Sequence, residues 1–92
     1  MNKYRALIKG KNLLFDVDGD RQKMGFYVTR FVEAETYAQA EQAALNLIIQ
    51  SEKLRGVLNS PADPPVFDVE EIDEVDSLAD NKIGFAFYRE QQ

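Results

Sequence analysis

Residues 12–34 read NLLFDVDGDRQKMGFYVTRFVEA, two apolar stretches on either side of a polar segment with an Asp-Gly step. In the first stretch Leu13, Phe15 and Val17 share one face, because side chains in a β-strand alternate between the two faces of a sheet. The second stretch, FYVTRFVEA, is long enough for another strand. An Asp-Gly step is typical of a tight reversal, so the sequence predicts an antiparallel hairpin here.

The residues before this hairpin, YRALIKG, show the same alternation and predict a further strand. Its two faces carry Tyr4, Ala6 and Ile8 on one side and Arg5, Leu7 and Lys9 on the other. The GKN segment at 10–12 is turn-like, so this strand is expected to end there and a second one to follow. Three strands with short links predict an antiparallel meander.

A helix is expected to begin after the third strand. Thr36 and Gln39 have the spacing of a capping box, in which both side chains satisfy free backbone N–H groups. Apolar and small residues then recur at spacings of three and four, as on the buried face of a helix: Tyr37, Ala40, Ala44, Leu47, Ile48 and Ser51. Gly56 is expected to end the helix after about 18 residues.

The remaining sequence predicts a loop and two strands. NSPADPP at 59–65 is a connecting loop, because its prolines remove backbone donors. In VFDVEEIDEVDSL at 66–78, strand alternation gives way to a spacing of three, which fits either a β-bulge or a helical end. We favour a bulged edge strand, because dense charge prevents edges from pairing. After a turn at Asp80-Asn81, KIGFAFYRE predicts a last strand with Ile83, Phe85 and Phe87 inward.

These elements predict one α+β domain over residues 1–92, with the order β-β-β-α-β-β. The mostly antiparallel five-stranded sheet would carry the helix on one face, with the strands in the order 1-2-3-5-4. The composition, 45% apolar and 11% aromatic, fits a globular chain of this length. The N-terminus lacks an apolar signal-peptide core, and no apolar run approaches the roughly 20 residues of a membrane span. A cytoplasmic, membrane-free protein is therefore expected.

Charge is unevenly distributed along this acidic chain, whose net charge is −5. Residues 1–30 carry seven Lys or Arg and three Asp, and residues 31–92 carry four Lys or Arg and thirteen Asp or Glu. Such separation can orient a protein partner or a second copy of the chain. The net sign makes nucleic-acid binding unlikely, since a basic domain is expected there.

The chain has no His and no Cys, which removes the usual nucleophile–base pairs and zinc ligand sets. No spacing among its carboxylates, Lys, Tyr or hydroxyl groups singles out a reactive group. We therefore expect no enzyme activity, with no catalytic, cofactor-binding or metal-binding residues and no cofactor.

The stretch LLFDVDGD, residues 13–20, resembles the nucleophile motif of haloacid-dehalogenase-type phosphatases. This resemblance implies a Mg²⁺-dependent phosphatase in which Asp16 attacks phosphorus and Asp18 protonates the leaving group. The family has Thr where this chain has Asp20, and its parallel βα repeats do not follow here. A strand that ends in an Asp-Gly hairpin is the preferred interpretation.

The same carboxylates fall at positions 1, 3 and 5 of an EF-hand calcium loop. Position 6 is Arg21 instead of Gly, and position 12 is Tyr27 instead of Glu, so the pattern is incomplete.

A sheet with one helix leaves its second face uncovered, and this face provides the functional hypothesis. If Phe15, Val28 and Phe85 face the helix, alternation places an apolar group on the other side: Leu7, Leu14, Tyr27, Phe31, Ala86 and Tyr88. Exposed apolar patches commonly bind other molecules. The acidic strand offers a second candidate, an edge that docks a basic protein patch: Asp68, Glu70, Glu71, Asp73 and Glu74.

The sequence therefore predicts a small binding protein that forms a homodimer or docks a protein partner as an adaptor or inhibitor. An alternative is an aromatic platform for single-stranded RNA, favoured by the basic first strand and disfavoured by the acidic remainder.

Overall fold

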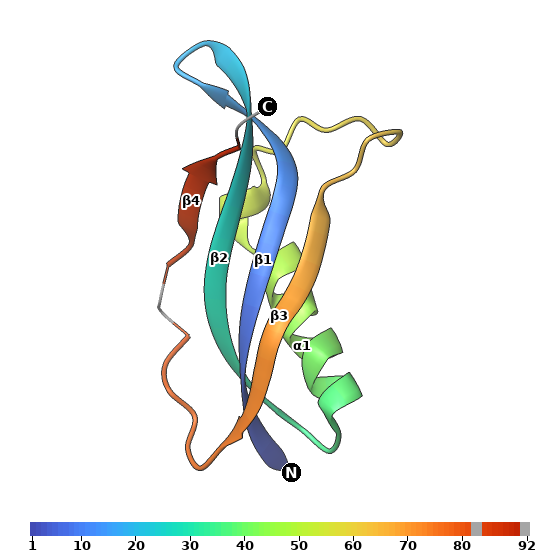
Figure 1. Ribbon diagram of the computed structural model, residues 1–92, viewed down its shortest axis with the longest axis vertical. Coiled ribbons are helices and arrows are strands. Elements are labelled where there is room, and N and C mark those ends of the chain that lie inside the picture. Colours follow the sequence, from blue (N-terminus) through green and yellow to red (C-terminus); the bar gives the residue numbers. More distant parts are fainter. Residues whose placement is uncertain (82–83, 91–92) are drawn as a thin grey trace.

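The computed structural model describes residues 1–81 and 84–90 and shows a four-stranded antiparallel sheet with one helix on one face (Figure 1). The elements in chain order are β1 (Asn2–Val17), β2 (Asp20–Ala34), α1 (Tyr37–Ile49), a 3₁₀ turn (Glu52–Leu54), β3 (Val66–Val75) and β4 (Ala86–Arg89). The strands lie in the order β3-β1-β2-β4. The predicted α+β class is confirmed, whereas the prediction of five strands is wrong.

The error in strand number lies at the GKN segment, where the structure has a bulge in one continuous strand. The register of β1 against β2 shifts between Gly10 and Leu13, and Asn12 adopts a left-handed φ of 61°. Asn tolerates this conformation in turns and in bulges alike. The side-chain amide of Asn59 stabilises the bulge. Its Nδ2 donates to the Asn12 carbonyl at 2.7 Å, and its Oδ1 accepts from the Leu14 N–H at 2.8 Å.

The strand order also differs from the prediction on one side of the sheet. The last strand lies beside β2 as predicted, but β3 pairs with β1 instead of with β4. Figure 1 shows β3 and β4 at opposite edges of the sheet, with β1 and β2 between them. The bulged edge strand is confirmed: the β3 register shifts where Leu7 faces Glu71 and Ile8 faces Val69, which leaves Glu70 as the extra residue.

The helix begins as predicted and ends earlier than predicted. Thr36 Oγ1 accepts from the Gln39 N–H at 3.2 Å, and Gln39 Oε1 accepts from the Glu35 N–H at 3.2 Å. α1 ends at Ile49 instead of near Gly56, because Ser51 is extended and its hydroxyl caps the following 3₁₀ turn.

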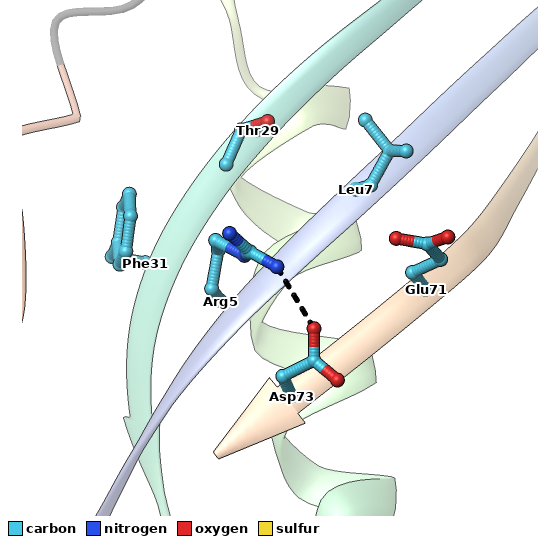
Figure 2. Close-up of a pocket in the computed structure, with 6 residues that line it drawn as sticks. All are labelled: Arg5, Leu7, Thr29, Phe31, Glu71 and Asp73. Carbon is cyan, nitrogen blue, oxygen red and sulfur yellow. Dashed lines mark hydrogen bonds and ion pairs between the residues drawn. The ribbon is translucent and has the colours of Figure 1, made fainter. Parts of the chain in front are cut away.

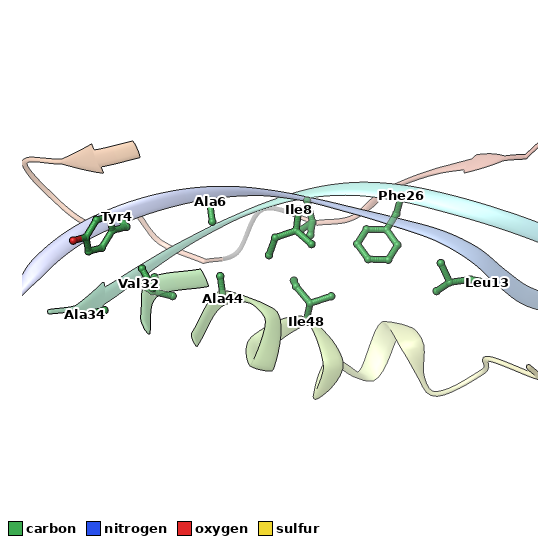
Figure 3. Close-up of a cluster of buried hydrophobic side chains, with 11 residues drawn as sticks. Tyr4, Ala6, Ile8, Leu13, Phe26, Val32, Ala34, Ala44 and Ile48 are labelled. Atoms are coloured by element: carbon green, nitrogen blue, oxygen red, sulfur yellow. The ribbon is translucent and has the colours of Figure 1, made fainter. Parts of the chain in front are cut away.

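The core lies between the sheet and α1 (Figure 3). The helix contributes Ala40, Ala44 and Ile48 to it, three residues of the predicted apolar stripe, while Tyr37 and Leu47 are exposed. The small alanines let the helix approach the sheet closely. The sheet contributes Tyr4, Ala6, Ile8 and Leu13 from β1 and Phe26, Val28, Val32 and Ala34 from β2.

Phe26 is the centre of an aromatic cluster at one end of this core. Its ring centroid lies 4.9 Å from that of Phe85, 5.8 Å from that of Phe87 and 6.0 Å from that of Phe67. The predicted inward positions of Phe85 and Phe87 are thus confirmed, whereas Ile83 lies outside the described residues. The Phe26 ring also lies against Gly10, its cross-strand partner, whose missing side chain leaves the space that the ring fills.

Candidate protein-binding face of the sheet

The face of the sheet opposite α1, here called the outer face, is built by the central strands β1 and β2. Inward residues such as Tyr4 and Val28 are buried against the helix, so their neighbours in each strand point the other way. The two strands pair in register across this face: Arg5 opposite Phe31, Leu7 opposite Thr29, and Lys9 opposite Tyr27. β1 therefore presents two cations around a leucine, and β2 presents two aromatic rings around a hydroxyl.

A groove of about 410 Å³ lies on the outer face, near the start of β1 and the end of β2 (Figure 2). Its lining comes from three strands: Arg5, Leu7, Thr29, Phe31, Glu71 and Asp73. Arg5 Nη2 donates to Asp73 Oδ2 at 2.9 Å, and both side chains are about half exposed. Such an exposed pair contributes at most about 1 kcal/mol. The groove therefore has an aromatic wall on β2, an acidic wall on β3 and an ion pair across its floor.

Beside the groove, two tyrosines form a stack on the outer face. The rings of Tyr27 and Tyr88 lie 5.8 Å apart with 30° between their planes, and Lys9 Nζ lies 5.6 Å from the centroid of Tyr27. Hydrogen bonding with the Tyr27 side chain raises the pKa of Lys9, and electrostatic interaction with Tyr27 and Tyr88 adds to the rise. Tyr88 lies over Gly25, its cross-strand partner. A cation and two aromatic rings are thus held together next to the groove.

Most of the apolar residues expected on this face come together. Leu7 and Phe31 line the groove and Tyr27 and Tyr88 form the stack, while Leu14 lies apart, beyond the bulge, in a recess near Lys23. Tyr27 is 39% exposed and the other four are half-buried. The expected patch is therefore a groove and a stack, with charged side chains covering part of its apolar area.

The expected acidic edge is divided between several surroundings. Asp73 pairs with Arg5, and Asp68 Oδ2 lies 3.7 Å from Lys11 Nζ. Glu71 lines the groove, Glu70 is the bulged residue, and Glu74 lies opposite Tyr4 at the other end of the strand. The basic and acidic segments of the sequence are thus neighbouring strands, and their charges partly neutralise each other.

Sequence reasoning missed Asn81, which fixes one wall of the groove. Its Oδ1 accepts from the Phe31 N–H at 2.7 Å, and its Nδ2 donates to the Phe31 carbonyl at 2.8 Å. The amide thereby takes the place of a neighbouring strand at the edge of β2, beyond the residues that β4 covers. The sequence shows Asn81 only as a turn residue, and nothing local connects it with a residue 50 positions earlier.

The phosphatase-like stretch forms a hairpin turn. Val17 pairs with Asp20, and Asp18 and Gly19 between them adopt φ values of 54° and 89°. Asp16 Oδ1 accepts from the Gly19 N–H at 2.8 Å, so this carboxylate stabilises the turn. The three aspartates are exposed, and among the described residues no three potential ligands are grouped to hold a metal ion.

Comparison of the chain with known protein families, curated proteins and solved structures finds no match. The function must therefore be inferred from the outer face itself. Within residues 1–81 and 84–90, no helix has the length and apolar character needed to cross a membrane.

Proposed function

We propose that the protein is a non-enzymatic binding protein whose outer face docks another protein, with a second copy of the chain as the first partner to test. The observation that carries this proposal is the groove and the tyrosine stack on a sheet face that α1 leaves uncovered. Half-buried aromatic rings beside a shallow groove are the residues that most often contribute binding energy at protein interfaces.

The charges on this face support a protein partner. Asp73 and Asp68 neutralise Arg5 and Lys11 within the same sheet, so burial of the aromatic rings leaves these two cations paired. The carboxylates of Glu71 and Asp73 line the groove itself and would repel the phosphates of RNA. A cytoplasmic homodimer, adaptor or inhibitor would suit such a surface.

The first test of self-association is the solution mass, by light scattering behind a sizing column at two concentrations and two salt strengths. A mass of twice the 10.5 kDa chain is expected. Association that weakens only slightly with salt would assign the interface to the aromatic groups, because exposed ion pairs are screened by salt. A monomer under all four conditions would contradict self-association and turn the search to a different protein.

Replacing Phe31 with glutamate is expected to weaken association at least about 30-fold, since central aromatic anchors contribute about 2 kcal/mol or more. The new carboxylate would also lie beside Glu71 and Asp73 at the groove. Ile49→Glu is the matched control, because Ile49 is 58% exposed on α1, on the other side of the sheet. Circular dichroism should show both variants folded. Equal dimerisation of Phe31→Glu and wild type would contradict the use of this face.

A further inference from the structure

The pairing register of the central strands makes the outer face complementary to itself. Arg5, Leu7 and Lys9 on β1 lie directly beside Phe31, Thr29 and Tyr27 on β2, with no shift along the strands. Each cation thus has an aromatic ring at its own level on the neighbouring strand. If a second copy packs on this face with its β1 over β2 of the first copy, level by level, its cations therefore lie over aromatic rings.

We propose that two copies pack outer face to outer face about a twofold axis that runs parallel to the strands, between β1 and β2. Such an axis places β1 of each copy over β2 of the other and keeps every residue at its level. Arg5 then lies over the partner's Phe31, Lys9 over the partner's Tyr27, and Leu7 over the partner's Thr29. This arrangement rests on the proposed self-association and specifies its geometry.

The contacts in this arrangement repeat one that a single copy already makes. Lys9 Nζ lies 5.6 Å from the centroid of Tyr27 in the same chain, within the distance at which a cation is attracted to a ring face. Sheets that pack face to face lie about 10 Å apart, which the side chains of Arg, Lys and Tyr span together. The groove, with Leu7 and Thr29 in its lining, lies on the axis, so residues of both copies fill it.

The other aligned arrangement has its twofold axis perpendicular to the strands and places each strand over its own copy. β3 would then face β3, and Asp68, Glu71 and Asp73 would lie against the same acidic row. Arg5 and Lys9 of β1 would face each other in the same way. Like charges opposite each other disfavour such an interface. The parallel axis instead carries β3 over the partner's β4, where Ala86 and Tyr88 point outward.

The arrangement can be tested by cross-linking, because the chain has no cysteine and each engineered one is unique. Asp68, Lys9, Tyr27 and Ala86 lie at one level across the four strands. In the proposed dimer Asp68 is about 10 Å from the partner's Ala86, and Glu71 is about 17 Å from its own copy across three strand spacings. With the perpendicular axis, Glu71 instead lies close to its own copy and Asp68 lies far from the partner's Ala86. A bismaleimide that spans about 10 Å therefore distinguishes the two dimers.

We expect a mixture of Asp68→Cys and Ala86→Cys chains to give a cross-linked pair, and Glu71→Cys alone to give none. The Phe31→Glu substitution should abolish the mixed cross-link. A Glu71→Cys self-link, with or without the mixed link, overturns this arrangement and leaves the proposed self-association standing. A protein that is monomeric by mass before the linker is added overturns both. A dimer that gives neither link overturns this arrangement and leaves self-association standing, and the Phe31→Glu variant then shows whether the outer face is its interface.

Discussion

Replacing Phe26 with alanine is expected to lower the free energy of unfolding by about 4 kcal/mol, the middle of the range for truncation of a buried aromatic residue to alanine. The Phe26 side chain is fully buried and three other aromatic rings surround it, at 4.9–6.0 Å between centroids. These rings come from β3, from β4 and from the residue just before β4, which lie on opposite edges of the sheet. The cavity would therefore loosen both edge strands at once.

Urea denaturation followed by circular dichroism measures this loss. A domain of this size has roughly 5–15 kcal/mol of stability in total, so the variant should remain folded only at low denaturant concentrations. Phe87→Ala is the matched control, because Phe87 belongs to the same cluster but is 39% exposed. Its loss should be less than half as large. Equal losses in the two variants would show that Phe26 is not the centre of the core.

Replacing Gly10 with alanine should lower the free energy of unfolding by about 1–2 kcal/mol, although alanine ordinarily stabilises an extended backbone relative to glycine. A Cβ at this position would lie 2.0 Å from Cε2 of Phe26. The ring cannot move away, because it is fully buried among its aromatic neighbours. The cost of overpacking, about 1–3 kcal/mol, therefore exceeds the gain of about 0.5–1 kcal/mol in backbone entropy.

Two other glycines provide controls for this substitution. Gly84→Ala should change the free energy of unfolding very little, because nothing lies within 4 Å of the added Cβ. Gly25→Ala meets the end of the Tyr88 ring at 2.4 Å, but Tyr88 lies on the outer face and can swing away, so a smaller loss is expected. In a Phe26→Ala background, Gly10→Ala should cost almost nothing. An undiminished cost in that background would show that the clash is not with Phe26.

The elements that the sequence predicted correctly are those with local signals. The Asp18-Gly19 turn, the Thr36 cap and the alternation along β1 each depend on residues within a few positions of one another. The predicted end of the helix at Gly56 is wrong, because Ser51 is extended and its hydroxyl caps a new turn. Spacing alone puts Ser51 on the apolar stripe of the helix, and periodicity does not distinguish a residue of the stripe from a cap.

The incorrect strand number and order depended on contacts between residues far apart in the sequence. Whether GKN is a turn or a bulge depends on Asn59, which lies 47 residues after Asn12 and binds its carbonyl. The position of β3 beside β1 depends on pairs such as Arg5 with Asp73, separated by 68 residues. No periodicity within β3 distinguishes β1 from β4 as its neighbour.

The candidate site could be predicted in part for the same reason. Alternation was sufficient to assign Leu7, Tyr27, Phe31 and Tyr88 to one face. It placed Leu14 there as well, because periodicity does not show that a bulge separates Leu14 from the groove. The acidic wall of the groove required the pairing of β3 with β1, which the predicted strand order lacked.

The two edges of the sheet differ in how they disfavour edge-to-edge association with further chains. Along β3 the carboxylates would repel a second β3, which disfavours the addition of another chain there. On the other side the edge strand is β4, whose four residues offer only a short row of backbone groups, and beyond β4 the Asn81 amide binds the backbone of Phe31. Both borders thus disfavour edge-to-edge growth of the sheet. Any association through the outer face then ends with the pair, because a twofold contact uses that face of both partners.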